Sequence, residues 1–175
     1  MKALACLFII TMILTGCGSA PTSNSDNPSQ ESPEQENPAP PEITGYVMDQ
    51  KKDQILVVAP LEPDSESNPK AMWVSEAPKG RWVGKQVEVW VKNGVRESFP
   101  SQAEAEQVTV LEMSQVEGAD LEASEALSKA LMEIPGDKLL AVKLILYLEE
   151  EDKWEVQLTR IDSSNEDLET MIADR

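Results

Sequence analysis

The sequence predicts an α+β fold in which a small antiparallel β-barrel or sandwich is followed by a helix and a β-hairpin. Two observations support this prediction. Residues 43–112 contain about six short β-rich runs separated by polar and turn-forming segments. After residue 113 the apolar residues follow helical spacing, and two longer apolar-rich runs joined by a charged turn come next.

The first part begins with two β-rich runs, residues 43–49 and 55–59, whose polar connection favours a hairpin. The segment 61–70 contains two prolines among acids and serines, which predicts a surface loop. Residues 71–75 form the third predicted strand. The next, 86–92, alternates: Val87, Val89 and Val91 share one face, and Glu88, Trp90 and Lys92 share the other.

A hairpin is expected at Asn93-Gly94, since this pair suits a two-residue turn. Its returning strand would be 95–99, ended by Pro100, and a last strand would cover 107–112.

The second part begins with a helix for which Asp120 is the expected N-cap and which Pro135-Gly136 ends. Strands 138–149 and 154–161 form the predicted hairpin, one face of which we expect the helix to cover. A short terminal helix would follow. Its apolar face would consist of Leu168, Met171 and Ile172.

The N-terminus has the features of a secretory signal: Met1-Lys2 is followed by twelve almost unbroken apolar residues, too few to span a bilayer as a helix. Leu14-Thr15-Gly16-Cys17 resembles the bacterial lipobox, at which the cysteine becomes the lipid-modified first residue of the mature chain. The alternative is an ordinary signal sequence followed by a free cysteine. We expect residues 1–16 to be a lipoprotein signal peptide and Cys17 to carry acyl chains, such as palmitate, that hold the protein at the membrane.

Residues 17–42 are the expected tether, because after Cys17 they contain no large apolar side chain and include six of the chain's 12 prolines. The folded part would then consist of a barrel domain, 43–113, and a helix-and-hairpin appendage, 114–175.

Charge excludes some functions. With 15 basic against 32 acidic residues, the net charge of −17 argues against nucleic-acid binding.

Because the chain has no histidine, a Ser-His-Asp triad is impossible. Ser67 and Lys70 have the Ser-x-x-Lys spacing of acyl-enzyme hydrolases but lack the helical context and partner motifs. The acidic runs 149–152 and 162–167 could hold calcium, but the second lacks the spacing and the glycine of a calcium loop. Solvated charged turns are the favoured interpretation, and weak divalent-ion binding is the alternative. We therefore expect no catalytic residues, no metal and no cofactor.

Candidate ligand-binding residues are Trp90, Phe99 and Gln102. Trp90 could stack on a ligand from the outer face of its strand, but packing beneath the helical region is the favoured reading. Residues 97–102 could form a ligand rim or a strand end followed by a turn. The acidic composition disfavours anionic ligands, apart from a local basic pocket around Lys79, Arg81 and Lys85.

A string of short motifs in residues 43–112 resembles the YobA-like lipoprotein domains of Bacillus-type bacteria, which have no assigned function. The motifs are Gly45-Tyr46-Val47, Ile55-Leu56-Val57-Val58, Ala71-Met72-Trp73, Ser75-Glu76-Ala77-Pro78, Gly84, Val87-Glu88-Val89-Trp90, Gly94 and the run Glu97-Ser98-Phe99-Pro100-Ser101-Gln102-Ala103. The resemblance implies an OB-like barrel and carries over no catalytic residue. Residues 119–161 are more faintly similar to a PepSY-like envelope domain, through Ala126-Leu127 and Trp154-Glu155-Val156.

These features lead us to expect a lipid-anchored protein of the cell envelope, on the extracytoplasmic face of the membrane, that binds an unknown envelope protein or glycan without catalysing a reaction. The alternative is a PepSY-like regulator or inhibitor of an envelope enzyme.

Overall fold

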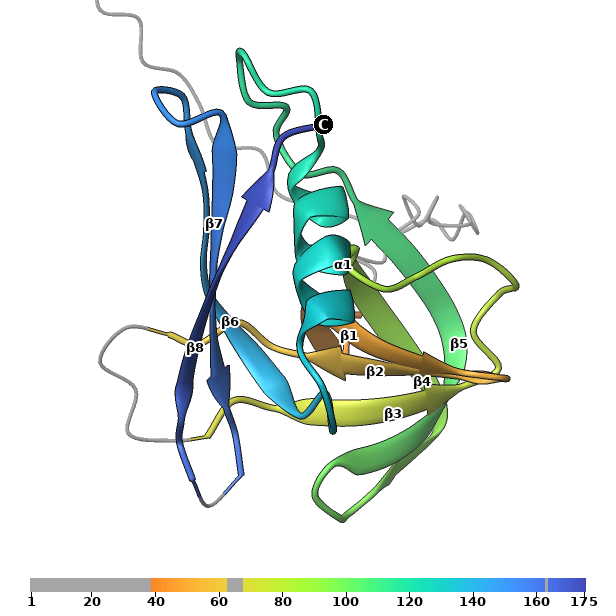
Figure 1. Ribbon diagram of the computed structural model, residues 1–175. Helices are drawn as coiled ribbons and strands as arrows, with labels where there is room; N and C mark the ends of the chain where they lie inside the picture. The colour runs from red at the N-terminus through yellow and green to blue at the C-terminus, as the bar shows by residue number, and fades with distance from the viewer. Residues whose placement is uncertain (1–38, 63–67, 163) are drawn as a thin grey trace, which may run out of the picture. The chain divides into compact units, whose positions relative to one another are not determined.

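The computed structural model describes residues 39–62, 68–162 and 164–175 (Figure 1). The predicted signal peptide, Cys17, most of the predicted tether and Ser67 lie outside these residues. The described part belongs to one compact unit that begins at Pro38. Within it, no helix is long and apolar enough to cross a bilayer.

Five strands close into a barrel in the order β1-β2-β3-β5-β4 (Figure 1). They are β1 (Ile43–Lys51), β2 (Gln54–Val58), β3 (Ala71–Ser75), β4 (Gln86–Arg96) and β5 (Ser101–Leu111). All neighbours are antiparallel except β3 and β5, which pair in parallel from Met72–Ser101 to Ser75–Glu104. This order and this single parallel pair are those of an OB-like barrel, so the predicted fold class is confirmed and one pair departs from the predicted antiparallel arrangement.

The barrel interior is filled by alternate side chains of its strands. Val87 and Val89 are fully buried on β4 and Val91 packs against the same cluster, as their alternation predicts. The cluster consists of Ile43, Val47, Ile55, Val57, Met72, Val74, Trp82, Val87, Val89, Ala103 and Ala105.

The prediction of a hairpin turn at Asn93-Gly94 is wrong. Both residues have the positive φ angles of such a turn, 61° and 78°, yet they lie inside β4, where the register with β5 is irregular between Lys92 and Arg96. The chain instead reverses at residues 97–100, and β5 is one strand of 11 residues. The dipeptide therefore adopts the local conformation its residues favour, but as a bulge in a longer strand.

Helix α1 (Ala123–Glu133) begins two residues later than expected, with Glu122 as N-cap instead of Asp120. The Glu122 backbone N–H donates to the Glu125 carboxylate at 3.1 Å, which satisfies a group that the start of a helix leaves unpaired. The backbone N–H of Asp120 is instead bound by Asp174, as discussed below. The helix ends before Pro135-Gly136, as predicted.

A second sheet, in the order β6-β7-β8, follows the helix. Strands β6 (Leu140–Leu148) and β7 (Lys153–Arg160) form the predicted hairpin. The prediction of a terminal helix is wrong. This segment forms strand β8 (Asp167–Ala173), which pairs antiparallel with β7. Leu168 and Ile172 lie an even number of residues apart, and both pack on the core from one face of the strand.

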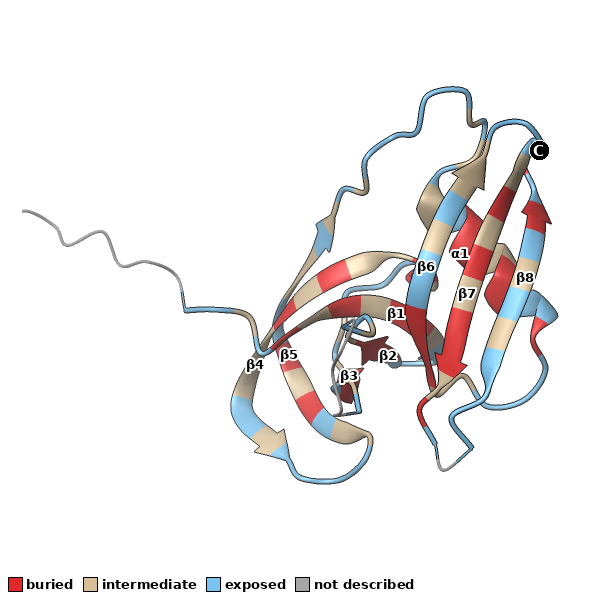
Figure 2. Ribbon diagram, turned by 90° about the vertical axis from the view of Figure 1, so that its left-hand side faces the viewer, coloured by how far each residue is buried: buried red, intermediate tan, exposed pale blue. Residues whose placement is uncertain are grey.

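Helix α1 covers one face of this sheet, as predicted, and Figure 2 shows it behind β6, β7 and β8. A single hydrophobic cluster joins α1 and the sheet to the outer surface of the barrel. It includes Leu127 and Leu131 of the helix, Trp154 of β7, and Met48 and Leu56 of the barrel. The helix and sheet therefore pack beside the barrel as part of one core.

Candidate functional site

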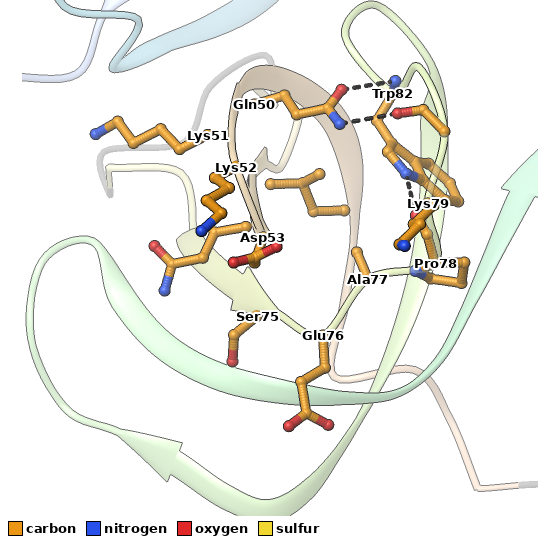
Figure 3. Close-up of a pocket in the computed structure, with 13 residues that line it drawn as sticks. Gln50, Lys51, Lys52, Asp53, Ser75, Glu76, Ala77, Pro78, Lys79 and Trp82 are labelled. Atoms are coloured by element: carbon orange, nitrogen blue, oxygen red, sulfur yellow. Dashed lines mark hydrogen bonds between the residues drawn. The ribbon is translucent and has the colours of Figure 1, made fainter.

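A pocket of about 730 Å³ opens at the end of the barrel where β1 meets β2 and β3 leads toward β4 (Figure 3). Its walls come from the β1–β2 turn, residues 50–54, and from the loop that follows β3, residues 75–80, together with Trp82. This volume lies within the usual range for a small-molecule site.

Hydrogen bonds hold the two loops together. The Gln50 side chain accepts from the Trp82 backbone N–H at 3.1 Å and donates to the Gly80 carbonyl at 2.8 Å. The Trp82 indole N–H donates to the Pro78 carbonyl at 2.7 Å, and the Glu76 N–H donates to the Asp53 carbonyl at 3.2 Å. These contacts cross from the turn to the loop and within the loop, so they fix the two walls of the pocket relative to each other.

Two buried side chains supply the apolar surface of the pocket. Ile55, the second residue of β2, is 1% exposed, and Trp82 is 8% exposed as part of the barrel core. Ala77 and Pro78 extend this surface along the loop. The site thus combines an apolar floor with a polar entrance.

Three lysines line the entrance, Lys51, Lys52 and Lys79, together with the carboxylates of Asp53 and Glu76. Figure 3 shows Lys52 and Asp53 on one side of the opening, Lys79 across from them, and Lys51 turned away. The Lys51 ammonium lies 4.2 Å from the ring centroid of Trp73, outside the pocket, and Glu76 forms an ion pair with Lys92. Lys52, Lys79 and Asp53 remain as charged groups at the mouth.

The structure does not bring Lys79, Arg81 and Lys85 together in one basic pocket, as the sequence had led us to expect. Lys79 lines the pocket, whereas the Lys85 ammonium lies 5.9 Å from the ring centroid of Trp82 and lines another hollow beside α1. Lys51 and Lys52 were not among the predicted pocket residues, because they lie about 30 residues earlier and reach the loop only because β1, β2 and β3 are neighbours. The hairpin turn predicted there was the one available signal.

The three predicted ligand-binding residues do not form a single site. Gln102 lies on β5 beside Trp73 and lines a smaller hollow of about 230 Å³. Phe99, 55% exposed, lies in the β4–β5 loop. Residues 97–100 thus form a turn after a strand end, and Gln102 belongs to the strand that follows.

Trp90 does not pack beneath the helical region, so the favoured prediction for the packing of this side chain is wrong. It is half-buried on the outer face of β4, outside both hydrophobic clusters of the described residues, and its indole N–H donates to the Ala39 carbonyl at 2.6 Å. The other tryptophans are packed: Trp82 and Trp154 are core residues, and Trp73 packs partly buried against the larger cluster.

The described residues include no group of three or more His, Cys, Asp or Glu side chains arranged to hold a metal ion. The barrel, its pocket and the mixed charges at the mouth define an OB-like domain with a candidate binding site at one end.

Residues 44–112, which form the barrel, match a family described as "Protein of unknown function (DUF3221)". No curated protein and no solved structure gives a significant match to the chain. The family match ends before α1, so the similarity of residues 119–161 to PepSY-like domains remains a prediction, as does the YobA-like assignment.

Proposed function

We propose that the protein is a lipid-anchored lipoprotein of the cell envelope whose barrel acts as a non-enzymatic binding module. The observation that supports the binding role is the pocket at the barrel end, which the Gln50 contacts to Gly80 and Trp82 keep open. Its apolar floor and charged mouth suit the recognition of a ligand or of a partner's side chains.

The anchor is proposed from the signal-like N-terminus and from the small residues before Cys17. Cys17→Ala should abolish acyl-chain incorporation and leave unprocessed precursor, because the modified sulfur is lost. Cys6→Ala is the matched control, since this cysteine lies within the expected signal peptide. The measurement is incorporation of labelled palmitate together with the membrane-bound fraction. Retention of label by the Cys17→Ala protein would contradict the anchor.

The binding role is tested by crosslinking in intact cells, with a photoreactive amino acid at Gln54, an exposed residue that lines the pocket. The matched position is Met132, which is 73% exposed on α1 and lies away from this pocket. We expect reproducible capture of one protein or glycan from Gln54 and none from Met132. Equal capture from both positions, or none from Gln54, would contradict binding at the pocket.

A catalytic role would be revealed by substrate turnover. Turnover by the purified protein that is lost in Asp53→Asn would contradict the non-enzymatic proposal, because this carboxylate lies at the pocket mouth.

A further inference from the structure

Basic side chains without an ion-pair partner gather at one end of the barrel. Among the described residues, six basic side chains form ion pairs with carboxylates, and none of them belongs to the segments 49–53 and 76–85. These two segments flank the pocket. They contain five basic residues, Lys51, Lys52, Lys79, Arg81 and Lys85, against three acidic ones.

This local composition is the reverse of that of the whole chain, which has 15 basic and 32 acidic residues. On an acidic protein, unpaired ammonium groups would ordinarily be drawn to nearby carboxylates. At this end Glu76 is already engaged by Lys92, and Lys52 and Lys79 are left on the two sides of the opening. The pocket mouth therefore has a net positive charge, from two ammonium groups against the Asp53 carboxylate, within a field that is otherwise negative.

Two ammonium groups on opposite sides of an opening suit a group carrying close to two negative charges. A phosphate monoester has this charge near neutral pH, whereas a carboxylate has one. Lysine is a common phosphate ligand and binds this group as a point charge. Among simple anionic groups, the arrangement of Lys52 and Lys79 thus favours phosphate.

Asp53 adds a second requirement for a ligand of this pocket. Its carboxylate lies at the mouth beside Lys52, and an ionised carboxylate can only accept hydrogen bonds. A ligand that places a hydroxyl beside its phosphate would donate to Asp53 and would let the negative phosphate lie toward the lysines. The apolar floor at Ile55 and Pro78 can contact a short carbon skeleton.

We propose that the barrel-end pocket binds a phosphate monoester whose carbon skeleton carries a hydroxyl group. This inference rests on the proposed binding function and names the ligand class of the same site. The phosphate monoester can be a free molecule or the headgroup of a lipid.

The test is an NMR titration of the purified full-length protein in non-ionic detergent, which follows the four tryptophan indole N–H signals. Glycerol 3-phosphate is the first probe, a short-chain (hexanoyl) lysophosphatidic acid, which has a phosphate monoester and a free hydroxyl, is the second, and glycerol is the neutral control. We expect a saturable shift of the Trp82 signal, because Trp82 lines the pocket, and no shift for Trp90 and Trp154. Affinity should fall as salt rises, since the lysines are exposed.

The double variant Lys52→Gln/Lys79→Gln should lose at least about tenfold in affinity because both ammonium groups are removed. The matched control, Lys70→Gln/Lys153→Gln, changes the net charge equally at sites outside the pocket and should bind as the wild type does. Asp53→Asn should weaken glycerol 3-phosphate less than the lysine variant does, and should strengthen binding of inorganic phosphate by removing a repulsive charge.

A lysine-dependent response to glycerol 3-phosphate identifies a free phosphate ester, and a response to the short-chain lipid alone identifies a headgroup; both support the proposal. Absence of a lysine-dependent response to both probes overturns it. If the Gln54 crosslink in cells still captures a partner in that case, the binding function stands and only the phosphate assignment fails.

Discussion

The Asp174 carboxylate accepts a hydrogen bond from the Trp154 indole N–H at 2.9 Å, and both side chains are buried, each 1% exposed. The same carboxylate accepts from the backbone N–H groups of Asp120 and Leu121 at 2.6 and 2.8 Å. Asp174 follows β8, Trp154 lies on β7, and residues 120–121 precede α1. One carboxylate therefore links the sheet to the segment that enters the helix.

These contacts decide the ionisation of Asp174. Burial by itself would raise the pKa of this carboxyl, but the hydrogen bonds from Asp120, Leu121 and Trp154 outweigh burial and hold the pKa below its ordinary value. Asp174 is thus a buried charge satisfied by three donors, which indicates a structural role.

Asp174→Ala should lower the melting temperature by at least about 5 °C, because three donors lose their acceptor and the indole N–H is buried. Glu169→Gln is the matched control, since Glu169 is an exposed acid on the adjoining strand β8. Thermal unfolding followed by circular dichroism measures the effect. A melting temperature unchanged by Asp174→Ala would contradict the structural role.

The stability contributed by Asp174 should depend on pH with a defined sign. Because its folded-state pKa lies below the ordinary value of 3.8, the contribution is present above that value and is lost as pH falls through the lower folded-state pKa. The difference in melting temperature between wild type and Asp174→Asn should therefore be constant from pH 7 to 5 and shrink below about pH 4. A difference that widens in acid would contradict the depressed pKa.

The shared core should make the barrel, helix and second sheet unfold together. Leu127 is fully buried on α1, in the cluster that also contains barrel residues, so Leu127→Ala should cost about 2–5 kcal/mol of unfolding free energy. Met132→Ala, on the exposed face of the same helix, should change it by less than about 0.5 kcal/mol. Urea unfolding followed at Trp82 of the barrel and Trp154 of the sheet should give one coincident transition. Two separate transitions would show that the parts unfold independently.

Gly84 should be the glycine least tolerant of alanine at the contact between barrel and helix. Its φ is +91°, and an added Cβ would lie 2.2 Å from the Ser124 carbonyl oxygen of α1. Gly94 also has a positive φ, but nothing lies within 4 Å of an added Cβ, so Gly94→Ala isolates the cost of the backbone conformation. We expect Gly84→Ala to be destabilising by clearly more than Gly94→Ala in thermal unfolding. Equal losses would indicate that helix and loop are not in contact.

By itself, the sequence determined the elements whose signals are local. The first hairpin, the alternating valines of β4, the end of the helix before Pro135-Gly136 and the β6–β7 hairpin all follow from side-chain periodicity or turn chemistry over a few residues. The OB-like arrangement came from a resemblance in an ordered set of short motifs.

Only the tertiary structure decided the features that depend on contacts between distant residues. Asn93-Gly94 forms a bulge because β4 continues to pair with β5 beyond it. Residues 167–173 form a strand because the open edge of β7 provides hydrogen-bond partners, whereas an isolated short helix would leave many of its backbone groups unpaired. The parallel β3–β5 pair, the Asp174–Trp154 bond and the pocket that unites Lys52 with Lys79 bring together residues 20 or more positions apart. Local propensity does not predict contacts between distant residues. Burial and strand pairing depend on the whole chain, and they contribute more free energy than any single turn or helical preference.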